Sequence, residues 1–543
     1  MMENFTTSDK DIRFEADIVI VGAGAAGITL ARKLKPTGAS ILLVESGGAD
    51  YNKAVQDLYN GQNTGEDYYD LRESRLRFFG GTTAIWGGRC AQLDEIDFEK
   101  RSWVDHSGWP VSKNDLAPYY RDAQKELEVP ATSDNTMPGF DDPLKNGRTT
   151  TAFWQFDEKF ARFTLPSCDD LTSADNVRVL LNATMTDAQT SENGRRVETI
   201  TIRNLNGGQA QISAQEFVLA MGGLEIPRML LAMCPDGHPD GIGNNTGQVG
   251  RYFMEHPHGR GARIYSDRPK KLFETFPAYM RDDKGDRYGL LIRPSEQTQK
   301  QTEILNTCFT IGVYRHPGQA QEFYKKAYHK AKHDMAPSSF GRGMWQVVKR
   351  ASRWVQDRIG PSMKTRMLKN PKFGIYAVLR AEQAPNPDSR VVLSTEKDAL
   401  GVPKIDLDWQ FLEIDKRSVR ETMYTFGEDL ERLGLGRVEL MPWLDEASGT
   451  LWEFDDLVTS HVKGGYHHIG TARMGDDPKK SVVDADCKVH GVENLYIAGS
   501  SVFPTGGWAN PTLTILALSL RLGDTLSARL YARRSCKSTA RVA

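Results

Sequence analysis

The chain of 543 residues is long for one hydrophobic core, and its composition is that of an ordinary globular protein. A formal net charge of −2 provides no global attraction to nucleic acid or to an anionic surface. The 6 cysteines include no C-x-x-C pair, which argues against a zinc ribbon, a redox dithiol or attached haem. We therefore expect two intergrown domains and no nucleic-acid partner.

The N-terminal stretch, MMENFTTSDKDIRFEAD, lacks the charged and then apolar pattern of a secretion signal. No uninterrupted apolar run reaches the length that crosses a bilayer. A cytoplasmic location is therefore the expectation, and export together with a partner that carries the signal stays open.

A strand, a glycine-rich turn and a helix are predicted one after another near the N-terminus. The apolar run ADIVIV is typical of a buried parallel strand, GAGAAG follows it, and ITLARKL predicts a helix. Gly22 permits the tight turn, Gly24 lets the backbone approach a pyrophosphate, and Gly27 lets helix and strand pack closely. The next predicted strand, 40–44, ends on Glu45, whose carboxylate is placed to accept hydrogen bonds from a ribose. This combination predicts a dinucleotide site in a Rossmann-like α/β domain.

The sequence contains one such fingerprint. GIGNNTG, at 241–247, has the wrong spacing and follows a loop rich in Pro, Gly and Asp instead of a strand, so we interpret it as a surface turn. Enzymes that pass electrons from NAD(P)H to a flavin commonly carry two fingerprints. The choice between FAD and NAD therefore depends on other segments.

Four further segments resemble the glucose–methanol–choline (GMC) oxidoreductase family, in the order in which that family has them. They are FFGGTTAIWGG at 78–88, VLAMGGLEIPRMLL at 218–231, GQVGRYFMEHP at 247–257 and the long stretch at 466–526. The resemblance implies an enzyme that binds FAD and oxidises an alcohol carbon. It also implies an α/β fold, in which a Rossmann-like FAD-binding domain is joined to a discontinuous antiparallel-sheet substrate-binding domain.

This resemblance divides the chain into three parts. The FAD-binding domain is expected at 12–264, including the flavin-wrapping loop at 78–90, and again at 461–535, with the catalytic pair. The substrate-binding domain is expected at 265–460, with a basic helical insertion at 320–372.

Within the family, ANPTLT and the flavin-wrapping loop resemble pyranose oxidases and bacterial glycoside 3-oxidases or dehydrogenases. This branch implies that the substrate is a sugar or glycoside, oxidised at its C3 or C2 hydroxyl. In the covalent pyranose oxidases, a histidine just before the loop tryptophan bonds the flavin. Here the residue before Trp86 is Ile85, which has no nucleophile. We therefore expect FAD to be held non-covalently.

Further cofactor contacts follow from the same resemblance. Glycines at such positions let the backbone lie against the cofactor, where a Cβ would clash. The segment VRVLLNATMTDA, at 177–188, resembles the strand whose backbone meets adenine, with Met185 as the contact. The other expected contacts are Gly80, Gly81, Thr82, Trp86, Gly87, Ala498, Gly499, Ser500, Pro511 and Thr512.

Oxidising an alcohol removes a proton from oxygen and a hydride from carbon; the flavin accepts the hydride at N5, so the protein must supply a base. The family's base stands three residues before the glycine of G-T-x-R-M-G, here Gly470, and counting back gives His467. Its partner is Asn510, which would hydrogen-bond the same hydroxyl. His468 is the rival base, but neighbouring side chains on an extended segment point to opposite faces, so we expect only one of the two to face the flavin.

Asn510 also has a purely structural interpretation. Followed by Pro511 and a run of helix-compatible residues, it is typical of a helix N-cap with proline at the first helical position. The two roles are compatible, because a helix that begins here would direct its positive end at the flavin.

Other chemistries fit the sequence poorly. His256 and His258, in EHPHG, have no third ligand adjacent, so no metal site is expected there, and AGSSVF lacks the spacing of a hydrolase nucleophile elbow. Two alternatives stay open: GMC-type oxidation of a non-sugar alcohol, and a non-redox lyase that keeps the flavin as a scaffold. The electron acceptor would be external, namely O2, a quinone or a cytochrome on a separate chain.

The middle of the chain carries fewer signals. EQAPNPDSRVVLS, at 382–394, predicts strand, turn and strand, and Gln383 is either a substrate-binding residue or an ordinary exposed glutamine. Residues 325–372 are basic, and 344–359 predict an amphipathic helix. A membrane, an acidic partner, a subunit interface or a lid would each suit it, but we interpret it as a surface helix with solvated charges.

Overall fold

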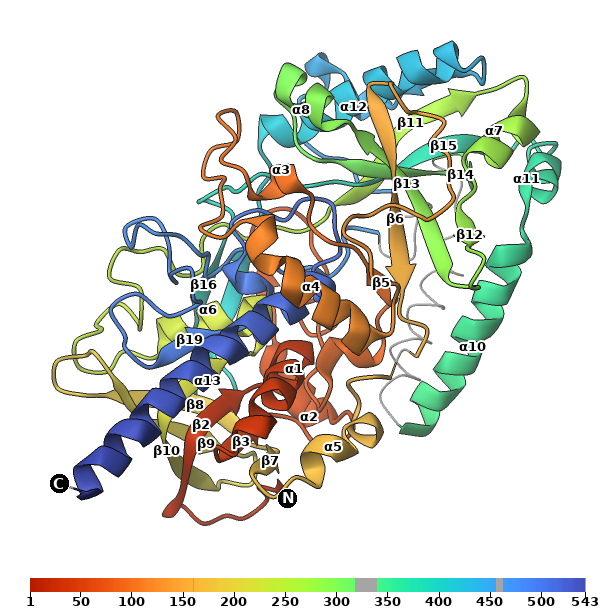
Figure 1. The fold of residues 1–543 in the computed structure, drawn as a ribbon. Coiled ribbons are helices and arrows are strands. Elements are labelled where there is room, and N and C mark those ends of the chain that lie inside the picture. Colours follow the sequence, from red (N-terminus) through yellow and green to blue (C-terminus); the bar gives the residue numbers. More distant parts are fainter. Residues whose placement is uncertain (160, 318–338, 456–461, 543) are drawn as a thin grey trace.

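The computed structural model describes residues 1–159, 161–317, 339–455 and 462–542. Two large sheets lie at opposite ends of the molecule, and both chain termini lie beside the first sheet (Figure 1). A smaller three-stranded sheet completes the strand arrangement of the described residues.

The first sheet is parallel at its centre, where the strand of the predicted dinucleotide motif pairs in parallel with both of its neighbours. The side chains of the strand of the dinucleotide motif and of the strand that ends before Glu45 are mostly buried, as their apolar patterns predict. In spatial order its strands are β1 (Met2–Asn4), β7 (Val177–Leu181), β3 (Ile41–Val44), β2 (Ile12–Val21), β10 (Gln209–Leu219), β9 (Val197–Arg203) and β8 (Thr184–Thr190), with β19 (Leu495–Ile497) also on β10.

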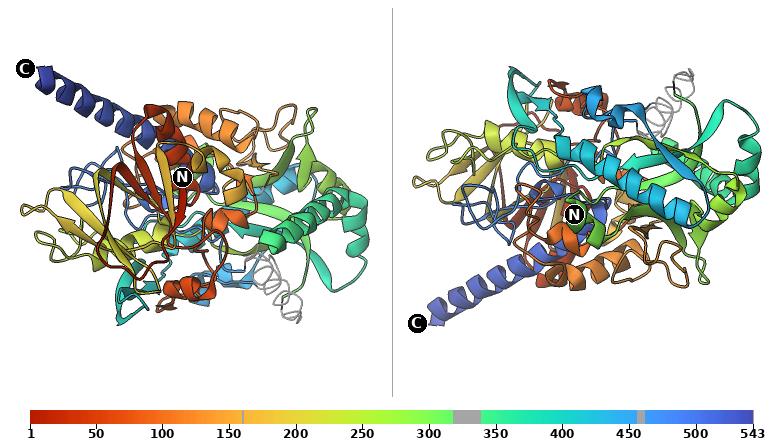
Figure 2. Two further views of the ribbon diagram at one scale, coloured as in Figure 1. Left: turned by 90° about the horizontal axis from the view of Figure 1, so that it is seen from below. Right: turned by 90° about the horizontal axis from the view of Figure 1, so that it is seen from above.

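The predicted order of strand, turn and helix is confirmed at β2, GAGAAG and α1 (Ala25–Leu34). Helix α1 packs against α13 (Thr512–Val542), which begins directly after Pro511 and also packs against α4 (Lys113–Leu127). The first turns of α13 are buried in the body, and its C-terminal part projects away from it in both views of Figure 2. The GAGAAG turn and the segment that ends at Pro511 are both expected to contact the cofactor. Each therefore leads into a helix, and these two helices pack against each other.

The second sheet is antiparallel throughout, as predicted for the substrate-binding part. Helix α12 (Glu413–Arg432) packs along it. In spatial order its strands are β18 (Arg437–Leu440), β11 (His258–Tyr265), β15 (Phe373–Arg380), β14 (Cys308–Arg315), β13 (Arg287–Pro294), β6 (Thr149–Phe156) and β5 (Arg89–Cys90), with β12 (Tyr279–Arg281) also on β13.

The predicted domain boundary at 265 is wrong for this sheet, because β5, β6 and β11 all come before it. Of the strand, turn and strand expected at 382–394, the turn and the second strand are present, but the first strand is absent. Strand β15 ends at Arg380 in the second sheet, whereas β16 (Arg390–Lys397) pairs with β17 (Pro403–Asp408) and, through it, β4 (Gly61–Asn63). Strand partners distant in sequence are chosen by the tertiary fold, so local patterns did not indicate them.

The basic insertion expected at 320–372 is helical where the structure describes it; its residues up to 338 lie outside the described part. Helices α10 (Ser339–Arg358) and α11 (Pro361–Met367) follow. The charges of α10 are not all solvated, which corrects that interpretation. Lys349 donates to the carbonyl oxygens of Ile85 (3.0 Å) and Trp86, and Arg353 donates to that of Gly87 (2.9 Å). Among the described residues, no helix has the length and apolar character needed to cross a membrane.

Candidate active site

A cavity collects the predicted motifs from both ends of the chain. Its walls are formed by the GAGAAG turn, the flavin-wrapping loop, the beginning of α13 and the end of β15. Most of the residues expected from the sequence line it. They are Gly22, Gly24, Glu45, Thr82, Trp86, Gly87, Met185, Ala498, Gly499, Ser500, His467, Asn510, Pro511 and Thr512.

At the dinucleotide end, the three fingerprint glycines have different surroundings. A Cβ on Gly22, whose φ is +110°, would lie 2.5 Å from the carbonyl oxygen of Ala220, and a Cβ on Gly27 would lie 2.0 Å from that of Gly22. Around Gly24, by contrast, there is open space. This glycine caps α1, whose first turn contains no acidic residue, so its free N–H groups and positive end are available to a phosphate.

Glu45 lies at the edge of the same turn and is buried. Its two carboxylate oxygens accept from the backbone N–H groups of Ala23 (2.9 Å) and Gly47 (2.8 Å), and burial raises its pKa. A carboxylate oxygen can accept more than one hydrogen bond, so capacity remains for a ribose hydroxyl.

Several polar atoms that line the cavity have no hydrogen-bond partner among the described residues. Trp86 Nε1 and His468 Nε2 are both buried in this way. Buried donors and acceptors without partners are rare in proteins, and at a binding site they indicate an absent ligand. Together with the open space at Gly24, they fit a bound dinucleotide that extends toward His467.

Two isolated bridges, Met254–Ile469 and Pro257–Gly464, hold two distant segments side by side in antiparallel register. This register places His256 against His467, with their Nδ1 atoms 2.7 Å apart. Two ring nitrogens this close must share one hydrogen, so one donates and the other accepts.

The carbonyl oxygen of Gly507 decides which nitrogen donates. It lies 2.8 Å from Nε2 of His256, and because a carbonyl can only accept, we assign the proton of His256 to Nε2. His256 Nδ1 is then the acceptor, His467 donates from Nδ1, and the lone pair of His467 is on Nε2. That atom is 3.1 Å from Nδ2 of Asn510, so the two expected catalytic side chains meet in the cavity.

The electrostatic surroundings keep this histidine neutral. Burial, followed by the neighbouring His256 and His258, lowers the pKa of His467 well below its usual value. Burial likewise lowers the pKa of His256. A neutral imidazole with an unprotonated Nε2, which here accepts from the side-chain amide of Asn510, is the protonation state that a general base requires.

Glu255 fixes the backbone on both sides of the histidine pair. Its carboxylate accepts from the hydroxyl of Tyr68 (2.6 Å) and from the backbone N–H groups of His256 (2.8 Å) and His467 (2.9 Å). Burial raises the pKa of Glu255 to about 7. The EHP segment lies within one of the family-like stretches, but nothing in its local pattern indicated this role.

Two family models match this chain. The model described as FAD dependent oxidoreductase matches residues 17–297, and the model described as GMC oxidoreductase matches residues 385–519, which include His467 and Asn510. The chain belongs to the GMC oxidoreductase family. It is an FAD-dependent oxidoreductase that acts on alcohol groups.

Similar proteins align with this GMC oxidoreductase along nearly their whole length. The fructose dehydrogenase large subunit of Gluconobacter japonicus is 23% identical, covering 94% of this chain and 97% of its own. Paromamine 6'-oxidase of Streptomyces fradiae is 25% identical, with 96% and 92% covered. Among solved structures, formate oxidase of Aspergillus oryzae has a TM-score of 0.54 at 16% identity, with 96% of this chain and 99% of that chain covered. Pyridoxine 4-oxidase of Mesorbium loti has a TM-score of 0.53 at 16% identity, with 94% and 98% covered.

Three of the expected cofactor glycines lie behind the cavity wall of this GMC oxidoreductase. Gly27 packs against Gly22, as predicted for helix and strand packing. Gly80 and Gly81 are not lining residues. The N–H of Gly80 donates to the carbonyl of Ala23 (2.7 Å), and a Cβ on Gly80 would lie 2.4 Å from the carbonyl oxygen of Phe163. Gly80 thus attaches the flavin-wrapping loop to the dinucleotide turn.

Gln383 does not contact the cavity, so its expected role in binding substrate is corrected. It is buried, and its Oε1 accepts from the backbone N–H of Glu255 (3.0 Å) and from Nε1 of Trp409 (2.9 Å). Its Nε2 donates to the carbonyl of Gln410 (2.8 Å). Gln383 therefore supports Glu255, which in turn fixes the histidine pair.

His468 packs away from His467, against the rings of Tyr68 and Phe253, each with its centroid 6.0 Å away. Burial lowers the pKa of His468 to about 3. Its carbonyl accepts from the hydroxyl of Ser500 (2.7 Å), which joins this segment to the one after β19. The two histidine rings thus have different surroundings, but both residues line the cavity, so the expectation that only one of them faces it is not met.

No metal site was expected at His256 and His258, because no third ligand is adjacent to them in the sequence. Among the described residues, Glu255, His256 and His467 offer ligand atoms that all lie within 4.8 Å of one another. Those atoms already hydrogen-bond one another and neighbouring backbone groups, and the site contains no cysteine. We therefore describe the cluster as a hydrogen-bond chain.

Proposed function

We propose that this GMC oxidoreductase oxidises a secondary alcohol of a sugar or glycoside, at C3 or C2, to a ketone. The observation that carries the proposal is the chain from the Gly507 carbonyl through His256 to His467, which leaves one lone pair beside Asn510. The sugar is supported by the likeness of the flavin-wrapping loop and ANPTLT to pyranose oxidases and glycoside 3-oxidases. Similar proteins named for fructose and for paromamine support it further.

Bound FAD supplies a hydride acceptor at N5 of the flavin. His467 Nε2 takes the proton of the substrate hydroxyl, while Asn510 hydrogen-bonds the same oxygen and orients it. His256 keeps the His467 ring in the required tautomer, and its hydrogen bond grows stronger as His467 becomes cationic. Loss of the proton makes the carbon a better hydride donor, and the carbinol becomes a ketone.

The residues present fit a non-covalently held FAD. The glycine turn and α1 would hold the pyrophosphate, Glu45 the ribose, and Met185 the adenine. The residue before Trp86 is Ile85, which offers no nucleophile to the flavin. Acid precipitation of the yellow protein should release the colour into the supernatant, whereas a covalent flavin would stay in the pellet. The electrons would leave to an external acceptor, for which O2, a quinone and a separate cytochrome are candidates.

An anaerobic experiment tests the function directly. Purified yellow protein is mixed with glucosides, free sugars and simple alcohols while the visible flavin band is followed. Bleaching by a glycoside or sugar, lost in His467→Ala with FAD retained, supports the proposal. Bleaching by simple alcohols alone would assign a non-sugar substrate. A band that only dithionite bleaches would contradict the redox function, and lyase activity would then be assayed.

A further inference from the structure

Two arginines line the cavity on the side of the antiparallel sheet. Arg89 opens β5, at the end of the flavin-wrapping loop, and Arg380 ends β15. Their guanidinium carbons lie 4.9 Å and 5.0 Å from the ring centroid of Trp154. One aromatic ring therefore holds both cations at the wall that also contains His258.

No carboxylate of the described residues lies within ion-pair distance of either guanidinium. Arg380 donates to the hydroxyl of Thr310 at 3.3 Å, and Nε of Arg89 has no hydrogen-bond partner among the described residues. Nearby arginines differ, because Arg287 pairs with Asp357 at 3.0 Å and Arg353 pairs with Glu158 at 3.6 Å.

Neither cation has a carboxylate partner among the described residues, and Arg89 hydrogen-bonds only the side chain of Tyr279, so this wall is positive. Burial, together with Arg89, lowers the pKa of Arg380. Burial alone would raise the pKa of Tyr279, but the charges of Arg89, Arg287 and Arg380 outweigh it and lower that pKa. Like charges held close together in a partly buried wall are costly unless an anion completes the site, and paired guanidiniums suit carboxylate or phosphate.

We propose that Arg89 and Arg380 form an anion subsite beside His467, so that the substrate is a polyhydroxylated compound bearing a carboxylate or a phosphate. This proposal rests on the proposed function and narrows its substrate class. Binding of the anion at this wall would hold the other end of the substrate in the cavity, where His467 and Asn510 meet its hydroxyl.

Matched substrate pairs test this class. Methyl glucoside and methyl glucuronide differ by one carboxylate, and glucose and glucose 6-phosphate differ by one phosphate. We expect kcat/KM for flavin reduction to be about 100-fold higher for the anionic member of one pair, and the pair that shows it identifies the anion. Added salt should reduce the preference. Equal values within both pairs would overturn the subsite and leave the proposed function standing.

Arg380→Gln should raise KM for the anionic substrate with little change in the KM of the neutral one. Arg281→Gln is the matched control, because Arg281 is half-exposed and pairs with Asp357 outside the cavity. Malonate and inorganic phosphate provide a readout without turnover: either should raise the melting temperature of the wild type and of Arg281→Gln, and not of Arg380→Gln. If no compound bleaches the flavin but malonate or phosphate still raises the melting temperature of the wild type and not of Arg380→Gln, the subsite stands and the proposed function fails. An equal rise in melting temperature in the wild type, Arg281→Gln and Arg380→Gln would overturn the subsite.

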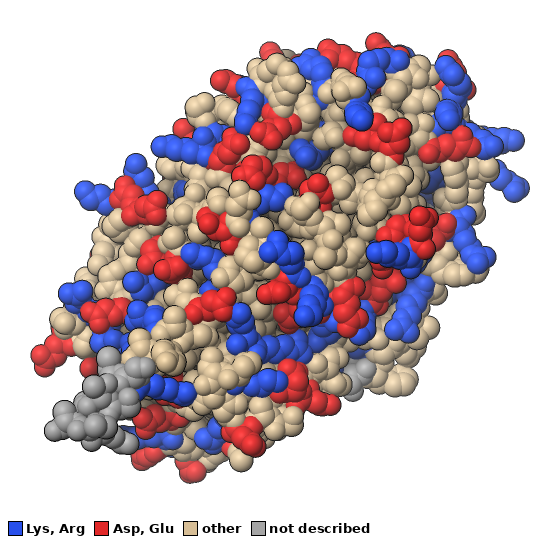
Figure 3. Space-filling model, in the orientation of Figure 1, with Lys and Arg blue, Asp and Glu red and all other residues tan. Residues whose placement is uncertain are grey.

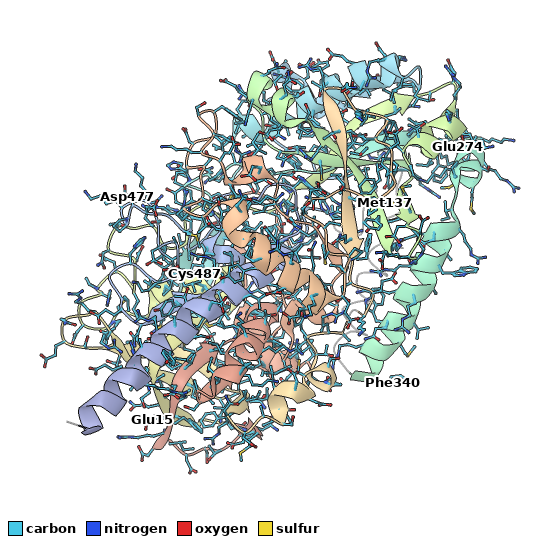
Figure 4. The ribbon with its side chains drawn as sticks, viewed as in Figure 1. Glu15, Met137, Glu274, Phe340, Asp477 and Cys487 are labelled. Carbon is cyan, nitrogen blue, oxygen red and sulfur yellow. The ribbon has the colours of Figure 1, made fainter. Side chains whose placement is uncertain are left out.

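A second inference comes from α10, whose polarity is inverted relative to an ordinary surface helix. Of the 12 large hydrophobic side chains that are exposed in the described residues, seven lie between 340 and 363. Phe340 is 77% exposed, Val347 66% and Trp354 57%. Figure 1 shows α10 along the outer edge of the molecule, and Figure 4 labels Phe340 at one end of it.

The apolar side chains of α10 share one face. Positions 340, 344, 347, 351, 354 and 355 follow the helical repeat, so they form a continuous stripe. The opposite face contains Lys349 and Arg353, which bind the loop carbonyls, and Trp345, which is buried. The body is thus contacted by the polar face, and the apolar stripe faces outward.

The charged side chains that α10, α11 and the residues after them carry are almost all basic. Residues 339–372 contain nine Lys or Arg and one acid, Asp357, which pairs with Arg281 and Arg287. Basic side chains are prominent in Figure 3 along the edge where α10 and α11 lie. A second copy docked on this stripe would oppose like charges, whereas an anionic lipid surface complements them.

We infer that the outer face of α10 lies on an anionic membrane surface, with the apolar stripe between lipid headgroups and Arg350, Arg358, Arg366 and Lys369 against their charges. For a cytoplasmic protein, the inner leaflet is such a surface. Because the other face of α10 holds the flavin-wrapping loop, the cavity wall would lie close to the lipid.

Vesicle sedimentation of the FAD-loaded protein tests this inference. We expect the wild type to bind phosphatidylcholine vesicles that contain phosphatidylglycerol, and we expect added salt to weaken this binding. The double variant Val347→Glu/Trp354→Glu should bind at least tenfold more weakly. Tyr424→Glu, at an exposed ring on α12, is the matched control and should bind like the wild type. If the wild type and both variants sediment equally with the vesicles, or if none of them sediments, the inference is overturned. Concentration-dependent dimers abolished by the double substitution, without vesicle binding, would assign the stripe to a second copy.

Discussion

The two ends of the cavity are built in different ways. At the dinucleotide end, backbone groups of neighbouring residues form the site, and glycines leave space for the ligand. At the catalytic end, side chains from distant segments meet, and their function depends on burial and on which nitrogen carries a proton. A site made from adjacent backbone tolerates distant changes, whereas a site made from remote side chains depends on every segment that positions them.

The largest expected effect comes from removing the base at the catalytic end. His467→Ala should slow flavin reduction by the true substrate by about 10³-fold or more, because no neighbouring group replaces the Nε2 lone pair. Stopped-flow absorbance under anaerobic conditions measures this rate. The FAD content should stay that of the wild type, and loss of FAD would show that the two ends of the cavity are not independent.

A smaller effect is expected at His256, which acts through His467. His256→Ala should slow flavin reduction by about 10- to 100-fold, because His467 loses the acceptor that fixes its tautomer. The pH profile distinguishes this role from a structural one. In the wild type His467 has a lowered pKa, so the rate should be flat near neutrality and fall only on the acid side. Removing the neighbouring ring should move that acid limb to higher pH, and an unmoved limb would contradict the positioning role.

The dinucleotide end can be tested with two neighbouring glycines. Gly24→Ala places a Cβ in open space at the cavity, so we expect FAD to bind about tenfold more weakly while the melting temperature of the apoprotein stays the same. Gly27→Ala places its Cβ 2.0 Å from a backbone oxygen and should destabilise the apoprotein itself. Flavin fluorescence titration and thermal unfolding separate the two results. Identical behaviour of both variants would contradict the difference in their roles.

The smallest catalytic effect is expected at Gln383. Gln383→Ala should lower the free energy of unfolding by about 2 kcal/mol, because the N–H groups of Glu255 and Trp409 lose their acceptor in a buried place. The KM for substrate should change little, because the side chain does not line the cavity. Denaturant unfolding and steady-state kinetics measure the two quantities. A large rise in KM with unchanged stability would restore the substrate-binding role.

The parts of the fold and of the site that neighbouring residues form were largely predictable from the sequence. The strand, turn and helix at GAGAAG, the acid that ends the next strand, the helix after Pro511 and the antiparallel second sheet were all expected. His467 and Asn510 were found through the spacing of a family motif, and the structure brings them 3.1 Å apart. Periodicity and turn chemistry act over a few residues, so a single sequence displays them.

Only the tertiary structure could show the rest. The partnership of His256 with His467 depends on the antiparallel bridges between segments about 210 residues apart, and the pairing of Arg89 with Arg380 on Trp154 depends on three strands of one sheet. The amphipathic pattern of α10 was visible in the sequence, but periodicity does not say which face packs inward. By itself the sequence determined the chemistry that the chain can carry out. The fold decided which buried side chains are neutral, which are charged and which meet in the cavity, because desolvation and long-range contacts set those properties.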